Sequence, residues 1–179
     1  MLLKAQSKYF SLPVRVGYVG IGALVFVAAY SIGASMSLQE QDAEDIRSSF
    51  LEDIENIDQT GIFLNNIEIA LSMFVPGVGV GIGVYSGIST GMVFNAFALI
   101  SSELAATQPL SVLATPFGVL EVLAYGVAIS RSGMLVPQLI MRSERTKGWR
   151  HFSVYTAIEI GIVIVALVAG SFIESQTIS

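Results

Sequence analysis

Four polar residues lie inside long apolar stretches of this sequence, where burying a polar side chain costs free energy. Asn65, Asn66 and Glu68 are close together in one stretch, and Glu121 lies in a later one. Two carboxylates with amides and no nearby base could share a proton or bind a cation, because neighbouring carboxylates repel each other when both are ionised. That chemistry would suit a transporter. The alternative, which we favour, is that these groups hold neighbouring helices together by hydrogen bonds, since such bonds are common between membrane helices.

A second pair of ionisable residues lies nearer the other ends of the apolar stretches. Arg131 comes close to the end of one stretch, and Glu159 lies shortly after the beginning of the last. We expect an ion pair between them, with the alternative that Arg131 extends to the membrane interface. A pair of this kind is more often structural than catalytic.

Residues for nucleophilic or metal chemistry are scarce. The chain has no cysteine and one histidine, His151, which excludes thiolate nucleophiles, disulfides, iron–sulfur clusters and multi-histidine metal sites. No serine or threonine has a recognisable general base, and the glycine-rich stretch lacks the Gly-Lys-Ser/Thr of a phosphate-binding loop. We therefore expect a protein that is not an enzyme and that has no cofactor and no metal.

The composition is that of a membrane protein. Of 179 residues, 53% are hydrophobic and 13% are charged, and the mean hydropathy of +0.70 lies outside the range of soluble domains. The formal net charge of −5 opposes nucleic-acid binding, because that binding depends on Lys and Arg neutralising phosphates. We expect the chain to lie in a lipid bilayer and to have no nucleic-acid partner.

Hydropathy predicts an all-α fold, a polytopic transmembrane helical bundle of about five spans, each of about 20 apolar residues. A cleaved signal peptide is the rival interpretation of the first span, which is longer than a typical signal-peptide core. Pro76 and the glycines after it could break the second span into a re-entrant helix, because irregular backbone is tolerated where protein covers it. We place the spans at residues 14–35, 62–82, 85–102, 116–134 and 151–173.

Between the first two spans the composition inverts. Residues 36–60 hold eight acidic residues and one base, Arg47. Ser37 followed by Glu40 has the form of a capping box, and apolar residues such as Ile46 and Phe50 follow at helical spacing, so we predict an acidic amphipathic helix. Anionic lipid would repel it, which favours packing on the protein's own outer face or on a partner. A solvated connector without a binding role is the simpler interpretation.

Basic residues predict the orientation in the cell membrane. Eight of the nine fall in segments that a cytoplasmic N-terminus places inside, and only Arg47 falls outside. Five spans then put the C-terminus outside. The chain divides into a cytoplasmic tail (1–13), a first span (14–35), an outer acidic helix (36–60) and a four-span region (61–179).

Glycines recur at every fourth position in the predicted third span and just before it. A stripe of this kind lets membrane helices approach closely, so we expect it to serve helix packing. Ala157 with Gly161, and Ala166 with Gly170, repeat the pattern in the last span. The stripe consists of Gly79, Gly83, Gly87 and Gly91.

Three segments carry motifs of one known family. Residues 62–66 read Ile-Phe-Leu-Asn-Asn, residues 116–121 read Pro-Phe-Gly-Val-Leu-Glu, and residues 169–174 read Ala-Gly-Ser-Phe-Ile-Glu. In this order they resemble the Phe-x-Asn-Asn, Pro-His-Gly-x-x-Glu and Ala-Gly-x-Ile-Glu motifs of the stage II sporulation protein M family of integral membrane proteins. Phe117 stands where that family usually has histidine, and Ser86 where it usually has asparagine.

The resemblance implies an architecture and, more remotely, a process. In spore-forming bacteria it implies a membrane scaffold that recruits peptidoglycan hydrolases, although nothing in this sequence points to peptidoglycan. We expect a non-enzymatic scaffold or accessory subunit of a larger membrane complex, with other membrane subunits or further copies of the chain as partners. The alternative is a small-solute or ion permease component with its polar site on the second and fourth spans.

Overall fold

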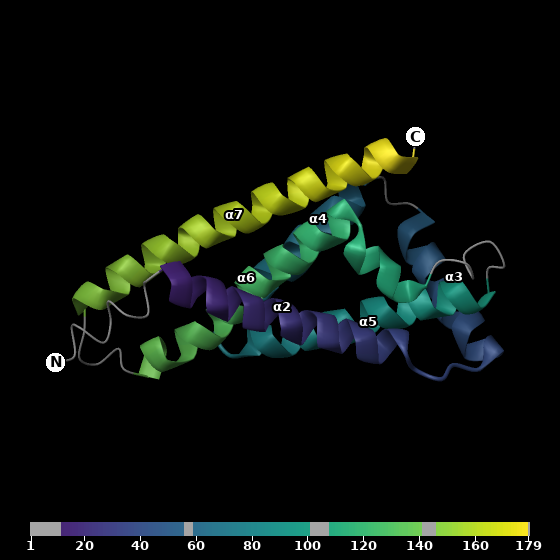
Figure 1. Ribbon diagram of the computed structural model, residues 1–179, viewed down its shortest axis with the longest axis horizontal. Coiled ribbons are helices and arrows are strands. Elements are labelled where there is room, and N and C mark those ends of the chain that lie inside the picture. The colour runs from purple at the N-terminus through teal and green to yellow at the C-terminus, as the bar shows by residue number, and fades with distance from the viewer. Residues whose placement is uncertain (1–11, 56–58, 101–107, 141–145, 179) are drawn as a thin grey trace.

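The computed structural model describes residues 12–55, 59–100, 108–140 and 146–178, and these are helical throughout apart from short connections (Figure 1). The predicted all-α class is confirmed for these residues, among which there is no strand. The predicted tail, residues 1–13, falls outside them except for its last two residues. The elements are α2 (Leu12–Ala34), α3 (Glu40–Glu55), α4 (Gln59–Ser72), α5 (Val78–Ile100), the short 3₁₀ helix η1 (Pro109–Ala114), α6 (Pro116–Ile140) and α7 (Thr146–Ile178).

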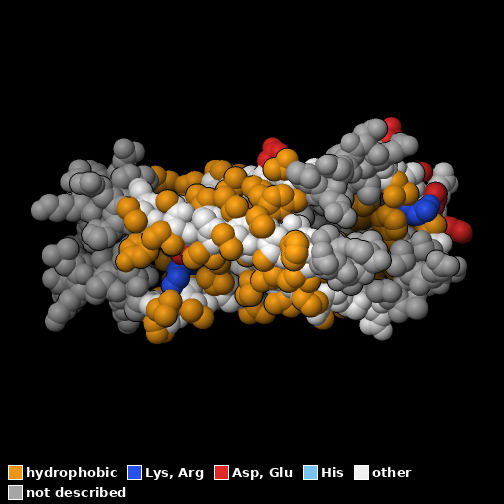
Figure 2. All heavy atoms as spheres, turned by 90° about the horizontal axis from the view of Figure 1, so that it is seen from above, with side chains coloured by type: hydrophobic (Ala, Val, Ile, Leu, Met, Phe, Trp, Pro, Cys, Tyr) orange, Lys and Arg blue, Asp and Glu red, His pale blue; other side chains and the backbone are white. Residues whose placement is uncertain are grey.

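Four helices among the described residues, rather than the five predicted, are long and apolar enough to cross a membrane. Each candidate span has 21 to 23 residues, which at about 1.5 Å per residue matches a hydrocarbon core of about 30 Å. Hydrophobic side chains cover the middle of the molecule (Figure 2), as expected for a surface that faces lipid. The spans are α2, α5, residues Pro116–Pro137 of α6 and residues Ser153–Ile173 of α7.

The predicted second span, residues 62–82, is wrong as a single helix. α4 has 14 residues, or about 21 Å, and is too short to cross a bilayer by itself. Proline disfavours a helix interior because it lacks an N–H group, and Pro76 is followed by Gly77, whose φ of 78° lies in the left-handed region that favours glycine. α5 therefore begins at Val78, earlier than the third span was predicted to begin.

The turn between α4 and α5 is attached to α6. The Ser132 hydroxyl is fully buried and donates a hydrogen bond of 2.6 Å to the Val75 carbonyl. The Gly77 N–H donates to the Ser132 carbonyl at 3.4 Å. These bonds give the backbone of an interrupted helix partners inside the protein, which is the condition for irregular backbone at membrane depth.

The bundle is built around α6 and α5. α2 packs on both, α7 packs on α6 and α4, and α3 packs on α5. The beginnings of α2 and α7 and the end of α6 lie at one end of the molecule, and α3 lies at the other (Figure 1). The core between them includes Phe26, Met73, Tyr125, Ile129 and Leu167.

Each of the four stripe glycines on α5 is buried against a neighbour. A Cβ atom at Gly91 would collide with the Tyr30 carbonyl of α2, and one at Gly83 would collide with the Ile129 side chain of α6. One at Gly87 would lie 2.9 Å from the Ala29 Cβ. In contrast, nothing lies within 4 Å of the Cβ position of Gly161 on α7. The last helix therefore does not use Gly161 for close packing within this chain.

Helix α3 is attached to α5 by its apolar side. Ala43 is fully buried, and the Phe50 and Phe97 rings meet edge to face with their centroids 5.8 Å apart. The Arg47 guanidinium lies over the same Phe97 ring, 5.9 Å from its centroid. Ile57, at the far end of the predicted apolar stripe, lies outside the described residues. The acidic helix thus has a defined orientation on the bundle.

Candidate functional site

The most strongly charged buried site joins two arginines to one glutamate. The Arg15 Nε donates to Glu159 Oε1 at 2.6 Å, and the Arg15 Nη2 donates to Glu159 Oε2 at 2.7 Å. The Arg131 Nε donates to Glu159 Oε2 at 2.6 Å, and its Nη2 donates to Oε1. Both carboxylate oxygens therefore accept bonds from both guanidinium groups, and we call these three residues the charge cluster.

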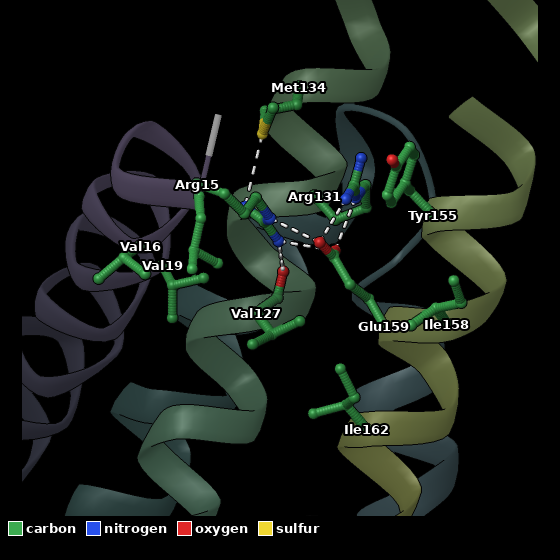
Figure 3. Close-up of a pocket in the computed structure, with 11 residues that line it drawn as sticks. Arg15, Val16, Val19, Val127, Arg131, Met134, Tyr155, Ile158, Glu159 and Ile162 are labelled. Carbon is green, nitrogen blue, oxygen red and sulfur yellow. Dashed lines mark hydrogen bonds and ion pairs between the residues drawn. The ribbon is translucent and has the colours of Figure 1, made fainter. Parts of the chain in front are cut away.

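Three helices position the charge cluster. Arg15 lies in the first turn of α2, Arg131 in the second half of α6, and Glu159 in α7, with α6 between the other two (Figure 3). The exposed fractions of their side chains are 14%, 2% and 12%. Ion pairs this far from water are stable only with close geometry and additional hydrogen bonds, because both partners lose their hydration.

Further bonds orient Arg15 on the surface of α6. Its Nη1 donates to the Ser130 hydroxyl at 2.8 Å and to the Met134 sulfur at 3.4 Å. Its Nη2 donates to the Val127 carbonyl at 3.1 Å. Five hydrogens of one guanidinium thereby contact α6 and α7, so Arg15 fixes where α2 begins relative to both.

Sequence reasoning placed Arg131 beside Glu159 but did not include Arg15. Arg131 is directed at Glu159 and buried, rather than extended to a membrane interface. In the sequence, Arg15 is one of the eight basic residues on the predicted cytoplasmic side, near Lys4 and Lys8 at the start of the first apolar run. Arg15 is the fourth residue of an apolar helix, and this position could have predicted a buried partner, because charges within spans usually have one.

The structure brings together two of the four residues predicted as a polar cluster. The Asn66 side-chain amide donates to Glu121 Oε1 at 3.2 Å, joining α4 to α6. Asn65 and Glu68 are exposed on α4 and do not share the partly buried position of Asn66. Asn65 and Glu68 are three residues apart and share a face, so Asn66 points in a different direction.

Metal binding finds no support in the described part of the chain. No three His, Cys, Asp or Glu side chains gather there in a group that could hold an ion. The side chain of His151 lies outside the described residues. The charge cluster also offers one carboxylate between two cations, which disfavours a further cation.

The fold and the motif positions can be compared with known families. The family model for stage II sporulation protein M matches residues 19–176. The chain belongs to this family. The match includes Asn66, Glu121, Arg131 and Glu159, whereas Arg15 precedes it. No curated protein and no solved structure matches the chain.

Membership of the stage II sporulation protein M family agrees with the architecture described above. Four apolar helices of membrane-spanning length and the family match together indicate a multi-pass membrane protein. The family is not a known enzyme family.

Proposed function

We propose that this protein is a non-enzymatic scaffold or accessory subunit of a larger complex in the cell membrane. The observation that carries the proposal is the orientation of α3. Its apolar side is held on α5 through Ala43 and Phe50, whereas acidic side chains such as Asp45 and Glu52 are exposed. A rigidly held charged helix is suited to binding another protein, because electrostatic complementarity sets specificity and orientation.

The arrangement of the helix ends supports the orientation that the basic residues predict. The start of α2, the end of α6 and the start of α7 lie together, opposite α3 (Figure 1). Four of the five basic residues that lie in described helices are near that end, namely Arg15, Arg131, Lys147 and Arg150, whereas Arg47 is on α3. The positive-inside rule then makes it the cytoplasmic end. In the proposed topology, α3 and the C-terminus are outside. α4 and the turn after it bring the chain from α3 back to Ser132 of α6 before α5 begins, so this interrupted segment and the four full spans make five passages.

The test is purification of the tagged protein, at its native expression level, from membranes in a mild detergent. Native gels and mass spectrometry would identify what remains bound. We expect other membrane subunits in fixed stoichiometry, and we expect the double variant Asp45→Asn/Glu52→Gln to lose them. Glu68→Gln, which removes an exposed carboxylate on α4, is the matched control and should retain them.

Two results would contradict the scaffold proposal. One is a wild-type protein that purifies alone, as a monomer or as a homo-oligomer. The other is a full set of subunits bound equally well by the α3 double variant. Membrane insertion is checked in parallel by resistance to alkaline extraction, so that loss of partners is not confused with loss of the protein.

A permease component is the second candidate, and the Asn66–Glu121 contact is the observation that favours it. The contact links the interrupted helix α4 to α6, and transporters often form their binding sites at interrupted helices. Glu121→Gln would then abolish uptake of a solute at unchanged protein level. The scaffold is the better supported of the two, since Asn65 and Glu68 do not join this contact.

A further inference from the structure

A groove opens beside the charge cluster, between α2 and α7. These two helices both pack on α6 but make at most marginal contact with each other. The resulting groove has a volume of about 370 Å³ and an apolar lining apart from the charge cluster. Val16 and Val19 line it from α2, and Ile158 and Ile162 line it from α7 (Figure 3).

The groove is open along its length. Val16, Ile158 and Ile162 are each more than half exposed, so its walls are accessible from the apolar surroundings of the bundle. In the space-filling view, a basic and an acidic side chain are recessed between hydrophobic ones (Figure 2). Its shape therefore combines a polar floor at one end with an apolar channel that continues along α2 and α7.

The described residues at this end of the molecule carry a net positive charge. Arg15, Arg131, Lys147 and Arg150 lie there on α2, α6 and α7, against one described carboxylate, Glu159. The groove opens at this same end, because Arg15 lies in the first turn of α2. An anion is consequently attracted to the groove, and a cation is repelled from it.

Arg15 also has a hydrogen-bond donor that an anion could use. Its Nη1 donates to the Met134 sulfur at 3.4 Å, and a thioether is a weak acceptor. A phosphate oxygen is a much stronger acceptor for a guanidinium group. It could replace the Met134 sulfur without disturbing the two bonds from Arg15 to Glu159.

We infer that this groove binds an anionic phospholipid of the surrounding membrane, with the phosphate at Arg15 and an acyl chain along Val16, Val19, Ile158 and Ile162. The two parts of the groove correspond to the two parts of such a lipid. Charge complementarity selects an anionic headgroup, and the apolar walls accept a hydrocarbon chain. This inference does not depend on the scaffold proposal.

The test uses the full-length protein in phosphatidylcholine nanodiscs. A small fraction of the lipid is a photoactivatable probe, either phosphatidylglycerol or phosphatidylcholine with the same diazirine-bearing acyl chain, and labelled residues are mapped by mass spectrometry. Phosphatidylglycerol should label the groove residues about fivefold more than phosphatidylcholine, since one basic residue adds about 1 kcal/mol of attraction to anionic lipid.

Two pairs of variants separate the headgroup contact from the acyl-chain contact. Arg15→Gln should reduce labelling by phosphatidylglycerol to the level of phosphatidylcholine, whereas Arg47→Gln, at the far end on α3, should not change it. Val16→Trp fills the groove and should reduce labelling by both probes. Val168→Trp, at an exposed valine of α7 outside the groove lining, is its matched control.

The inference is overturned if the two probes label the groove equally, or if a folded Arg15→Gln variant keeps the full preference for phosphatidylglycerol. Cross-linking of the groove to a second copy of this chain in place of lipid would also overturn it. If Arg15→Gln fails to fold, judged by thermal unfolding, Val16→Trp decides. Unchanged phosphatidylglycerol labelling of that folded variant rejects the site.

Discussion

Arg15 on α2 and Glu159 on α7 form a two-point ion pair across 144 positions of sequence, with N–O distances of 2.6 and 2.7 Å. The two helices make little other contact, and each packs on α6. Because Arg131 of α6 donates to the same carboxylate, one glutamate connects three helices.

Glu159→Gln should destabilise the protein by about 3 kcal/mol, because it leaves two buried guanidinium groups without their shared carboxylate. Thermal unfolding of the purified protein in detergent would measure the loss. Glu68→Gln removes an exposed carboxylate from α4 and should leave the melting temperature unchanged. Equal melting temperatures for the two variants would show that the charge cluster contributes nothing to stability.

Gly91→Ala should lower stability by about 1 to 3 kcal/mol, as overpacking typically does. Its Cβ would meet the backbone of α2 at Tyr30 and Ala34, and backbone cannot rotate away. Gly81→Ala on the same helix is the control, since nothing lies within 4 Å of its Cβ position. That variant should be neutral or slightly stabilising, because alanine favours a helix over glycine. The same unfolding assay compares them, and an equal response from both glycines would contradict the packing role.

Asn66→Ala should destabilise the protein by about 0.6 kcal/mol, the average for a hydrogen bond between membrane helices. The bond lost is the one from its side-chain amide to Glu121. Asn65→Ala removes the neighbouring exposed amide and should have no effect. A double-mutant cycle with Glu121→Ala, which removes the acceptor oxygen, would isolate the coupling when read by unfolding in denaturant. A coupling of zero would argue against this contact.

Phe50→Ala should release α3 from α5, because it removes the edge-to-face contact with Phe97. Aromatic pairs of this kind add about 0.5 to 1.5 kcal/mol beyond the area that they bury. Limited proteolysis of the protein in nanodiscs should then cleave residues 40–55 faster. Leu51→Ala is the matched control, as Leu51 and Phe50 are equally exposed, at 38% and 37%. If both variants are cleaved at the wild-type rate, the Phe50–Phe97 contact is not what holds α3.

Hydropathy alone located α2, α6 and α7 to within a few residues of their membrane-spanning parts, since about 20 consecutive apolar residues are needed to cross a bilayer. The family motifs of residues 62–66 and 116–121 could also be recognised in the sequence, and the family match confirms that resemblance. The helical spacing of Phe50 in an acidic segment predicted an amphipathic helix, and residues 40–55 are helical. Each of these features depends on a local pattern.

The division of residues 59–100 into α4 and α5 was left open by the sequence. Pro76 and the glycines after it indicated that the helix could break there, and it does, but hydropathy alone did not choose between a broken helix and an intact second span. The turn lies where Ser132 of α6 donates to the Val75 carbonyl, a partner 57 residues away. Helix packing also decides that Arg15 joins the charge cluster and that Asn65 and Glu68 are exposed. Periodicity assigns a residue to a helix face, but only the packing of helices on one another determines what that face contacts.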